Sequence, residues 1–388
     1  MASQLSPRPR PLPAPSGWAD EVADRARRGE ATKEDGLLLA RHPGVLIPLA
    51  DSLRREAVGD TVTYVVNRNL NFTNMCIGSC SFCAFSREDP YFRSDEEMRL
   101  RVREAVDYGA TEICMQAGLF PNFTFEDYAR RLDVIKETAP KIHVHAFSPE
   151  EVRHMCHNSK MHPEDALRGL KERGLGSVPG TAAEIFAPRV RKIICPGKLT
   201  ADDWEAIIVA AHRVGVPTTS TMMYGHAETW EERVEHILRI RDIQRRTGGF
   251  TEFVPLPFLD RNSPLADLGY RSPDLDTNLR VHALSRVLLH GHVKNIQASW
   301  VKMGPEGARA MLAAGCNDLG GTLMEENISR SAGSPWGVVF HPWQFEALIR
   351  EAGREPRERT TLYGRVEREA PLRGPPPTLR PRIHTPPD

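Results

Sequence analysis

The stretch Asn71-Phe-Thr-Asn-Met-Cys-Ile-Gly-Ser-Cys-Ser-Phe-Cys-Ala-Phe85 carries three cysteines in the spacing C-x3-C-x2-C: Cys76, Cys80 and Cys83. A loop that brings three thiolates together, with no fourth, can hold three irons of a 4Fe–4S cluster and leave one iron open to a small ligand. A closed structural zinc site takes four ligands, usually as two separated pairs, and the sequence has no second C-x2-C pair. The spacing therefore favours a cluster, with zinc and a set of inert buried thiols as the alternatives.

An open iron has a specific use beside a sulfonium. It lets the cluster give one electron to S-adenosylmethionine and release a 5′-deoxyadenosyl radical, chemistry that belongs to the cofactor. The loop resembles that of the radical S-adenosylmethionine (radical SAM) enzymes. The resemblance implies that Phe82, directly before the last thiol, leans on the cluster or the adenine, and ordinary loop packing is the alternative for this residue.

The overall composition excludes several classes of protein. The chain of 388 residues has 51 basic and 51 acidic side chains, so no net charge attracts nucleic acid or an anionic membrane. No apolar run approaches the roughly 20 residues of a membrane span, and the first ten residues contain no apolar core of a secretory signal. The seven cysteines, an odd number, show no disulfide framework. We expect a protein of the reducing cytoplasm that binds neither nucleic acid nor membrane.

Both ends of the chain are rich in proline. Prolines occupy alternate positions from 7 to 15, and Gly374-Pro-Pro-Pro377 and Thr385-Pro-Pro387 lie near the other end. Such stretches favour extended chain and cannot bury a core. We expect disordered tails at 1–16 and 366–388, an N-terminal helical extension at 17–60 and a single catalytic domain at 61–365.

Between the tails, strand-like apolar runs alternate with amphipathic helical stretches, which indicates βα units and a parallel sheet. The predicted strands are Thr61–Val66, Leu70–Phe72, Glu112–Gln116, Ile142–Phe147, Leu175–Val178, Thr218–Met223, Glu252–Pro255, Asn295–Ser299 and Asn317–Gly320. The predicted helices are Trp18–Arg28, Lys33–Arg41, Asp95–Tyr108, Phe125–Glu137, Ala201–Arg213, Trp230–Thr247 and Pro305–Ala314. About eight strands with a repeat of about 25–45 residues predict an α/β protein with a (β/α)8 TIM-type barrel.

In such a barrel the functional residues lie in the loops that follow the strands. The cysteine loop follows the first predicted strand, and other distinctive segments also fall at the carboxyl ends of strands. These segments are Gln116-Ala-Gly118, His145-Ala-Phe-Ser-Pro149, Pro179-Gly-Thr-Ala-Ala-Glu184, Tyr224-Gly-His226, Pro255-Leu-Pro257 and Gly320-Gly-Thr322. Chance placement would have scattered them over both ends of the barrel.

A narrower resemblance rests on longer stretches. Asn67-Arg-Asn-Leu-Asn-Phe-Thr-Asn-Met-Cys76 with Cys83-Ala-Phe85 resembles a group formed by the tyrosine-using subunit of FO synthase, aminofutalosine synthase and dehypoxanthine futalosine cyclase. Ser177-Val-Pro-Gly-Thr-Ala-Ala-Glu-Ile185 matches the FO synthase form, whereas the other two tend to carry Gly-Gly-Gly-Ala-Glu. The same form is indicated by three further segments: Thr251-Glu-Phe-Val-Pro-Leu-Pro-Phe258, Asn295-Ile-Gln-Ala-Ser-Trp-Val-Lys302 and Asn317-Asp-Leu-Gly-Gly-Thr-Leu-Met-Glu-Glu-Asn-Ile-Ser-Arg330.

This resemblance implies a radical SAM transferase of coenzyme F-420 biosynthesis. Such an enzyme breaks the Cα–Cβ bond of L-tyrosine and joins the 4-hydroxybenzyl group to carbon 5 of 5-amino-6-(D-ribitylamino)uracil, releasing 2-iminoacetate, methionine and 5′-deoxyadenosine. The implied cofactors are a 4Fe–4S cluster and S-adenosyl-L-methionine. Because only one cysteine triad occurs, we expect a separate second FO synthase subunit, and also an external electron donor. The alternatives are a menaquinone-pathway radical SAM enzyme, an iron–sulfur module without catalysis and a catalytically dead regulatory barrel.

The resemblance also implies residues that contact the cofactor. Gln116 and Gly118 would meet its methionine end, and Glu184 its ammonium or ribose. The alternatives are a tight turn that needs glycine and a first-turn glutamate favoured by a helix dipole. Relatives usually read Gln-Gly-Gly where this chain has Ala117, and they often carry His where it has Phe120.

Candidate substrate contacts are polar residues at strand ends. His145 shares a strand face with His143, and a barrel that holds ribityl hydroxyls and a uracil edge needs donors and acceptors of this kind. The candidates are His145, Tyr224, His226, Gln297, Ser299 and Asn317. For the histidines, a satisfied place in the core is the alternative.

The remaining residues singled out in the sequence have less specific roles. Glu325, Glu326 and Arg330 would bind the charged groups of tyrosine or form a solvated salt-bridge cluster. The run Arg239–Arg246 follows helical spacing and indicates a solvated face. We interpret the cysteines outside the loop as plain thiols: Cys114, Cys156, Cys195 and Cys316.

Overall fold

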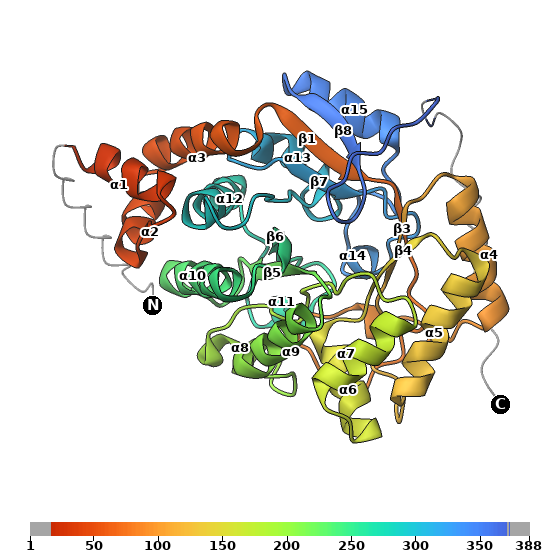
Figure 1. Ribbon diagram of the computed structural model, residues 1–388. Coiled ribbons are helices and arrows are strands. Elements are labelled where there is room, and N and C mark those ends of the chain that lie inside the picture. The colour runs from red at the N-terminus through yellow and green to blue at the C-terminus, as the bar shows by residue number, and fades with distance from the viewer. Residues whose placement is uncertain (1–16, 371, 373–388) are drawn as a thin grey trace.

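The computed structural model describes residues 17–370 and residue 372, and Figure 1 shows a set of parallel strands inside a ring of helices. The strands are β1 (Thr61–Val65), β2 (Asn67–Asn69), β3 (Glu112–Met115), β4 (His143–Ala146), β5 (Thr218–Tyr224), β6 (Phe250–Pro257), β7 (Asp318–Gly321) and β8 (Glu355–Arg359). The predicted tails at 1–16 and 373–388 lie outside the described residues.

Parallel pairing closes the barrel. β2 pairs with β3, β3 with β4, β5 with β6, and β7 with β1, which runs on into β2 with a break at one residue. Two positions of the barrel are short bridged segments instead of regular strands. At one, residues 177 and 178 bridge to His145 and Thr218, and at the other, residues 296 and 297 bridge to Phe253 and Asp318. Eight positions result, so the predicted (β/α)8 barrel is confirmed.

Besides the two bridged segments, two further strands differ from the prediction. Residues 70–72 form no strand, because the chain already leaves the barrel there and the side-chain amide of Asn71 donates to the carbonyl oxygen of Gln116 at 2.7 Å. β8 was not predicted, because its residues Glu-Pro-Arg-Glu-Arg do not alternate between apolar and polar. β8 pairs with β1 along its whole length, while β7 pairs with β1 on the other side.

The helices fill the ring and the N-terminal extension. They are α1 (Trp18–Arg27), α2 (Lys33–Ala40), α3 (Pro43–Val58), α4 (Asp95–Asp107), α5 (Phe125–Thr138), α6 (Pro149–Ser159), α7 (Pro163–Glu172), α8 (Pro188–Ile194), α9 (Ala201–Arg213), α10 (Trp230–Thr247), α11 (Pro264–Asp267), α12 (Leu275–Leu289), α13 (Trp300–Leu312), α14 (Ile328–Ser331) and α15 (Pro342–Glu351). The short 3-10 helix η1 (Phe85–Arg87) follows the cysteine loop.

Local sequence explains where the major helices begin. Ser94, Ser148, Thr200 and Thr229 each precede a helix and accept a hydrogen bond from the third residue inside it, whose acidic side chain bonds back. This capping box satisfies amide groups that a helix start would otherwise leave unpaired. Within the described residues, no helix is both long enough and apolar enough to cross a membrane.

The N-terminal and C-terminal additions both pack on the barrel. Helices α1, α2 and α3 lie beside α10 and α12 at one side of Figure 1. After β8 the chain stays in contact beyond residue 365, where the predicted domain ended, because Arg368 forms an ion pair with Glu358 and donates to the carbonyl oxygen of Gly109 at 2.6 Å. The folded part therefore includes the first residues of the predicted C-terminal tail.

The interior of the barrel holds polar as well as apolar side chains. In a strand, alternate residues point to the same face, and here every second residue of β3 and β5 lines an internal cavity: Glu112, Cys114, Thr219, Thr221 and Met223. The residues between them face the surrounding helices and are fully buried, as Ile113 and Met222 are. This alternation builds an apolar shell around a cavity that offers hydrogen bonds.

Candidate active site

One cavity of about 690 Å³ extends from the loops after the strands into the barrel. Its mouth includes all three cysteines of the Cys76–Cys83 loop. Its wall includes the predicted cofactor residues Phe82, Gln116, Gly118 and Glu184. Deeper in the barrel it reaches the predicted substrate contacts His145, Gln297 and Ser299. Residues far apart in the sequence are thus brought to one space.

The cysteine loop is held by its neighbours. The Asn74 side chain accepts from the Tyr91 amide at 2.9 Å and donates to the carbonyl oxygen of Asp89 at 3.0 Å, which fixes the chain on both sides of the cysteines. The Ile77 amide donates to the carbonyl oxygen of Leu119 at 3.0 Å. These bonds keep the thiols on the cavity wall.

The donor set fits an iron–sulfur cluster. The three thiols line one cavity, and all seven cysteines of the chain are unpaired. Burial raises the pKa of Cys80 to about 12, partly offset by the positive charge of Lys198. Metal binding favours the deprotonated form of a thiol. The described residues contain no group of three His, Cys, Asp or Glu side chains suited to a single metal ion. A cluster makes a different demand, because each thiolate binds its own iron.

The turn after β3 lies against the cysteine loop. A Cβ atom on Gly118 would lie 2.3 Å from the carbonyl oxygen of Met75, so only glycine permits this approach. The Ala117 amide donates to Glu151 Oε1 at 3.1 Å, and Gln116 Oε1 accepts from the Thr181 hydroxyl at 2.8 Å. The methyl group of Ala117, at the usual glycine position, is accommodated at the cavity wall.

A buried ion pair lies beside the loop. Lys198 Nζ and Glu184 Oε1 are 2.5 Å apart, and the ammonium is 5.4 Å from the centre of the Phe82 ring. Burial would raise the pKa of Glu184, but the charge of Lys198 outweighs it and keeps the pKa below its ordinary value. The backbone of Glu184 lies in the left-handed region (φ 46°), which is uncommon for a residue other than glycine. A carboxylate at this wall can accept hydrogen bonds from an ammonium or a ribose.

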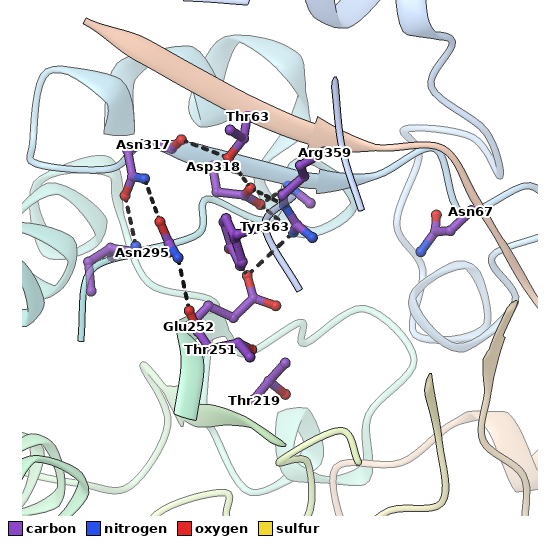
Figure 2. Close-up of polar contacts among 12 residues, drawn as sticks. Thr63, Asn67, Thr219, Thr251, Glu252, Asn295, Asn317, Asp318, Arg359 and Tyr363 are labelled. Carbon is purple, nitrogen blue, oxygen red and sulfur yellow. Dashed lines mark hydrogen bonds and ion pairs between the residues drawn. The ribbon is translucent and has the colours of Figure 1, made fainter. Parts of the chain in front are cut away.

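The floor of the cavity is a network of charged and polar groups. Arg359 of β8 donates to Asp318 at 2.6 and 3.0 Å, and its guanidinium lies 3.6 Å from Glu252, which also accepts from the Tyr363 hydroxyl at 2.6 Å (Figure 2). Burial raises the pKa of Glu252 to about 7 although Arg359 opposes the shift. The segment after β8 therefore closes the barrel with groups that a polar substrate can bind.

His145 is the histidine of this floor. Its Nδ1 lies 2.7 Å from the hydroxyl of Ser177, which is also 2.7 Å from Nε2 of His143. Burial lowers the pKa of His145 to about 4, so the ring is neutral at pH 7. A neutral imidazole can donate or accept one further hydrogen bond.

Three predicted substrate contacts do not line the cavity. The hydroxyl of the fully buried Tyr224 donates to Asn278 at 2.7 Å, and His226 lies 2.9 Å from Glu228 in a buried pair. Asn317 accepts from Arg286 at 2.7 Å and donates to Asn295 at 3.0 Å, a link also visible in Figure 2. Two of these partners, Asn278 and Arg286, lie on α12.

Two neighbouring glutamates after β7, Glu325 and Glu326, lie in different environments. Glu325 pairs with Arg68, Arg93 and Arg101 at 2.8, 3.0 and 3.1 Å, away from the cavity. Exposed Arg330 does not line the cavity either, whereas Glu326 does. Glu325 therefore belongs to a largely buried salt-bridge cluster with three other arginines, not to a solvated one with Arg330, and of the three residues only Glu326 lines the cavity.

Of the four cysteines outside the loop, one lines the cavity and three do not. Cys114 lines the cavity from β3, while Cys156, Cys195 and Cys316 are buried away from it. Burial raises the pKa of all four thiols, which keeps them protonated at pH 7. Their interpretation as plain thiols stays a prediction.

Several cavity residues were missed in the sequence. In the sequence, Lys198 and Lys302 cannot be distinguished from solvent-exposed lysines. Arg359 lies on β8, the strand that the hydrophobic pattern did not predict. Glu112 and Glu252 could have been found, because each is an acidic residue in a strand pattern that is otherwise buried. A charge at such a position indicates a polar barrel interior.

Comparison with known proteins identifies relatives over nearly the whole chain. Residues 70–240 match the radical SAM superfamily, and residues 247–372 match the CofH/MqnC C-terminal region. A 5-amino-6-(D-ribitylamino)uracil–L-tyrosine 4-hydroxyphenyl transferase of Methanosarcina barkeri is 52% identical over 92% of this chain and 96% of its own length. Enzymes of the same name from Archaeoglobus fulgidus (51% identical, 84% of this chain and 94% of the relative) and Methanopyrus kandleri (50%, 90% and 97%) are similar.

Solved structures share the fold. Methylornithine synthase superposes with a TM-score of 0.66 over 86% of this chain and 97% of its own, at 17% identity. The [FeFe]-hydrogenase maturase HydG gives 0.67 over 89% and 76%, at 15% identity. The match to the radical SAM superfamily implies a 4Fe–4S cluster and S-adenosylmethionine as cofactors, which the cysteine loop and the cavity fit. The chain is an enzyme that belongs to the radical SAM family of 5-amino-6-(D-ribitylamino)uracil–L-tyrosine 4-hydroxyphenyl transferases.

Proposed function

We propose that this chain cleaves L-tyrosine and transfers its 4-hydroxybenzyl group to carbon 5 of 5-amino-6-(D-ribitylamino)uracil, a step toward the deazaflavin chromophore of coenzyme F-420. The observation that carries the proposal is the identity of about half of all residues to transferases of this name along nearly the full length of both chains. The products are the joined pyrimidine, 2-iminoacetate, methionine and 5′-deoxyadenosine.

The mouth of the cavity is assigned to the cofactors. Cys76, Cys80 and Cys83 hold the cluster, which together with S-adenosylmethionine supplies a carbon-centred radical that takes a hydrogen atom from tyrosine. Contacts to S-adenosylmethionine come from Phe82, Gln116, Gly118 and Glu184, which line the wall next to the thiols. Lys198 keeps Glu184 ionised, so that carboxylate is ready to accept hydrogen bonds.

The floor of the cavity is assigned to the pyrimidine. A uracil ring with an amino group and a ribityl chain presents many donors and acceptors, and each needs a partner when buried. Polar groups of the deep cavity match this demand: Glu112, His145, Glu252, Gln297 and Ser299. His145 stays neutral at pH 7. It can therefore form a hydrogen bond with the uncharged edge of the uracil ring without leaving a buried charge unpaired.

Three further properties follow from the chemistry of the reaction. We propose that a second FO synthase subunit carries out the other half of deazaflavin formation, since one cysteine triad occurs in this sequence. The cluster requires an external electron donor. A cluster with an open iron is labile to oxygen, which favours the reducing cytoplasm as its compartment.

An anaerobic assay tests the proposal directly. Cluster-loaded protein is incubated with S-adenosylmethionine, a reductant and tyrosine, with and without the pyrimidine, and the products are identified by mass. We expect tyrosine-dependent 5′-deoxyadenosine and a coupled product that requires both substrates. Turnover of menaquinone-pathway precursors instead would assign the chain to that pathway, and failure to cleave S-adenosylmethionine would leave only an iron–sulfur module.

A further inference from the structure

Two lysines line the cavity, and their surroundings differ. Lys198 is neutralised by Glu184, its ion-pair partner at 2.5 Å. Lys302, near the start of α13, is half-buried, and its ammonium forms no hydrogen bond or ion pair with any residue from 17 to 370 or with residue 372. Burial lowers the pKa of Lys302 although Glu326 and Glu184 attract the positive charge. A desolvated ammonium without a partner is costly unless a ligand supplies one.

A carboxylate in the same cavity lacks a cation among the described residues. Glu326 is 5% exposed and accepts hydrogen bonds from backbone amides at the start of α14: Ser329 donates to its oxygens at 3.1 and 2.9 Å, and Ile328 and Arg330 also donate. No lysine or arginine of the described residues forms an ion pair with Glu326, and burial raises its pKa. Each carboxylate oxygen has a second lone pair, so the group can accept further hydrogen bonds.

Lys302 and Glu326 line the same cavity, and within the described residues they form no ion pair or hydrogen bond with one another. They differ in this from Lys198 and Glu184, which are bonded directly. An ammonium and a carboxylate that face one cavity with a gap between them are complementary to a molecule that carries both charges in reverse order. That molecule is an α-amino acid zwitterion.

The place of the pair in the barrel indicates which amino acid it binds. Glu184 follows the fourth strand position, whereas Lys302 and Glu326 follow the seventh and eighth. In an eight-stranded barrel the fourth position faces the eighth across the axis. The methionine end of S-adenosylmethionine is assigned to the Glu184 wall, which leaves the opposite wall for the other amino acid. Lys302 is also within electrostatic range of Glu184 and of Cys83, so this wall borders the cofactor end of the cavity.

We propose that Lys302 binds the α-carboxylate of tyrosine and Glu326 its α-ammonium, across the cavity from the cofactor. This inference rests on the proposed function, since it takes tyrosine as the substrate. The bond that breaks joins Cα to Cβ, and this position places that bond in the same cavity as the cofactor. Held there by two charges, tyrosine directs its ring toward the pyrimidine at the floor.

Binding measurements test the proposal without turnover. Enzyme loaded with cluster and S-adenosylmethionine, and kept without reductant, is titrated with three ligands: tyrosine, tyramine, which lacks the carboxylate, and 3-(4-hydroxyphenyl)propanoate, which lacks the ammonium. Loss of a hydrogen bond to a charged group costs about tenfold to hundredfold in affinity. We expect K302M to weaken tyrosine and the propanoate by this factor and to leave tyramine unchanged. E326Q should weaken tyrosine and tyramine and leave the propanoate unchanged.

A matched control is K294M, which removes an exposed lysine at the opposite end of the same βα unit and should change nothing. If both variants weaken all three ligands equally, the pair is structural and the proposal is overturned. If K302M weakens S-adenosylmethionine and spares tyrosine, the lysine serves the cofactor and the proposal is overturned as well. Failure of the unsubstituted enzyme to bind tyrosine would instead refute the proposed function. An unchanged tyrosine affinity in both variants would refute this inference alone.

Discussion

The Arg359→Met substitution tests how the floor of the cavity is held. Arg359 donates to Asp318 at 2.6 and 3.0 Å and lies 3.6 Å from Glu252. The side chains of Arg359, Asp318 and Glu252 are 4%, 0% and 10% exposed. Methionine fills a similar volume without charge, so two buried carboxylates lose their common cation.

The size of the effect follows from this burial. Removing one partner of a buried ion pair costs about 3–5 kcal/mol, because the remaining charge is left uncompensated. The pKa of Glu252 is already about 7 beside Arg359 and should rise further without it. We therefore expect R359M to lower the free energy of unfolding by about 3–5 kcal/mol at pH 8, and by less at pH 6, where Glu252 takes up a proton.

Anaerobic urea denaturation measures this effect. The control is R350M, which breaks the exposed pair of Arg350 and Glu346 and should cost less than about 1 kcal/mol. The double variant R359M/D318N should be more stable than the sum of the two single changes predicts. A loss below about 1 kcal/mol for R359M, equal to that of the control, would refute the view that β8 anchors the floor.

Three further predictions concern the cysteine loop, the cavity wall at Glu184 and the stability of the fold. G118A places a methyl group 2.3 Å from the carbonyl oxygen of Met75, so cluster content measured from iron and sulfide should fall, while A117G keeps it unchanged. K198M removes the ion-pair partner of Glu184 and should lower the affinity for S-adenosylmethionine, measured by equilibrium dialysis, at least about tenfold without loss of iron. An unchanged affinity would contradict the assignment of Glu184 to this cofactor. Burial raises the pKa of Glu228, but its bonds to His226 and the charge of Arg233 bring it down to about 2. The folded state then binds fewer protons than the unfolded state, so E228Q should lose about 3 kcal/mol at pH 7 and should flatten the fall in stability between pH 5 and pH 2.

The sequence predicted the barrel because its strands are short, regular and separated by helices with capping boxes. Leu70–Phe72 was mistaken for a strand, since an apolar triplet in an exit loop has the same pattern. β8 was missed for the opposite reason: four of its five residues are charged, and the only one of them that is buried is Arg359, at the floor of the cavity. Its pairing with β1 joins segments almost 300 residues apart, a contact that local pattern does not encode.

The candidate site was predicted best where spacing itself carries the chemistry. Cys76, Cys80 and Cys83 could be read from their intervals alone. Tyr224 and His226 follow a strand, as site residues do, but their hydrogen bonds turn them toward α12 and Glu228. Lys302 could not be singled out in the sequence, because only the folded chain shows that its ammonium lines the cavity and pairs with none of the described residues.

The central claim is that the three cysteines hold a cluster whose open iron binds S-adenosylmethionine. Electron paramagnetic resonance of the reduced, anaerobically loaded protein tests it most directly. The spectrum of a 4Fe–4S cluster should change when S-adenosylmethionine is added, and the C80A variant should lose both the cluster signal and the formation of 5′-deoxyadenosine. A spectrum that does not respond to S-adenosylmethionine, or full activity in C80A, would contradict the account.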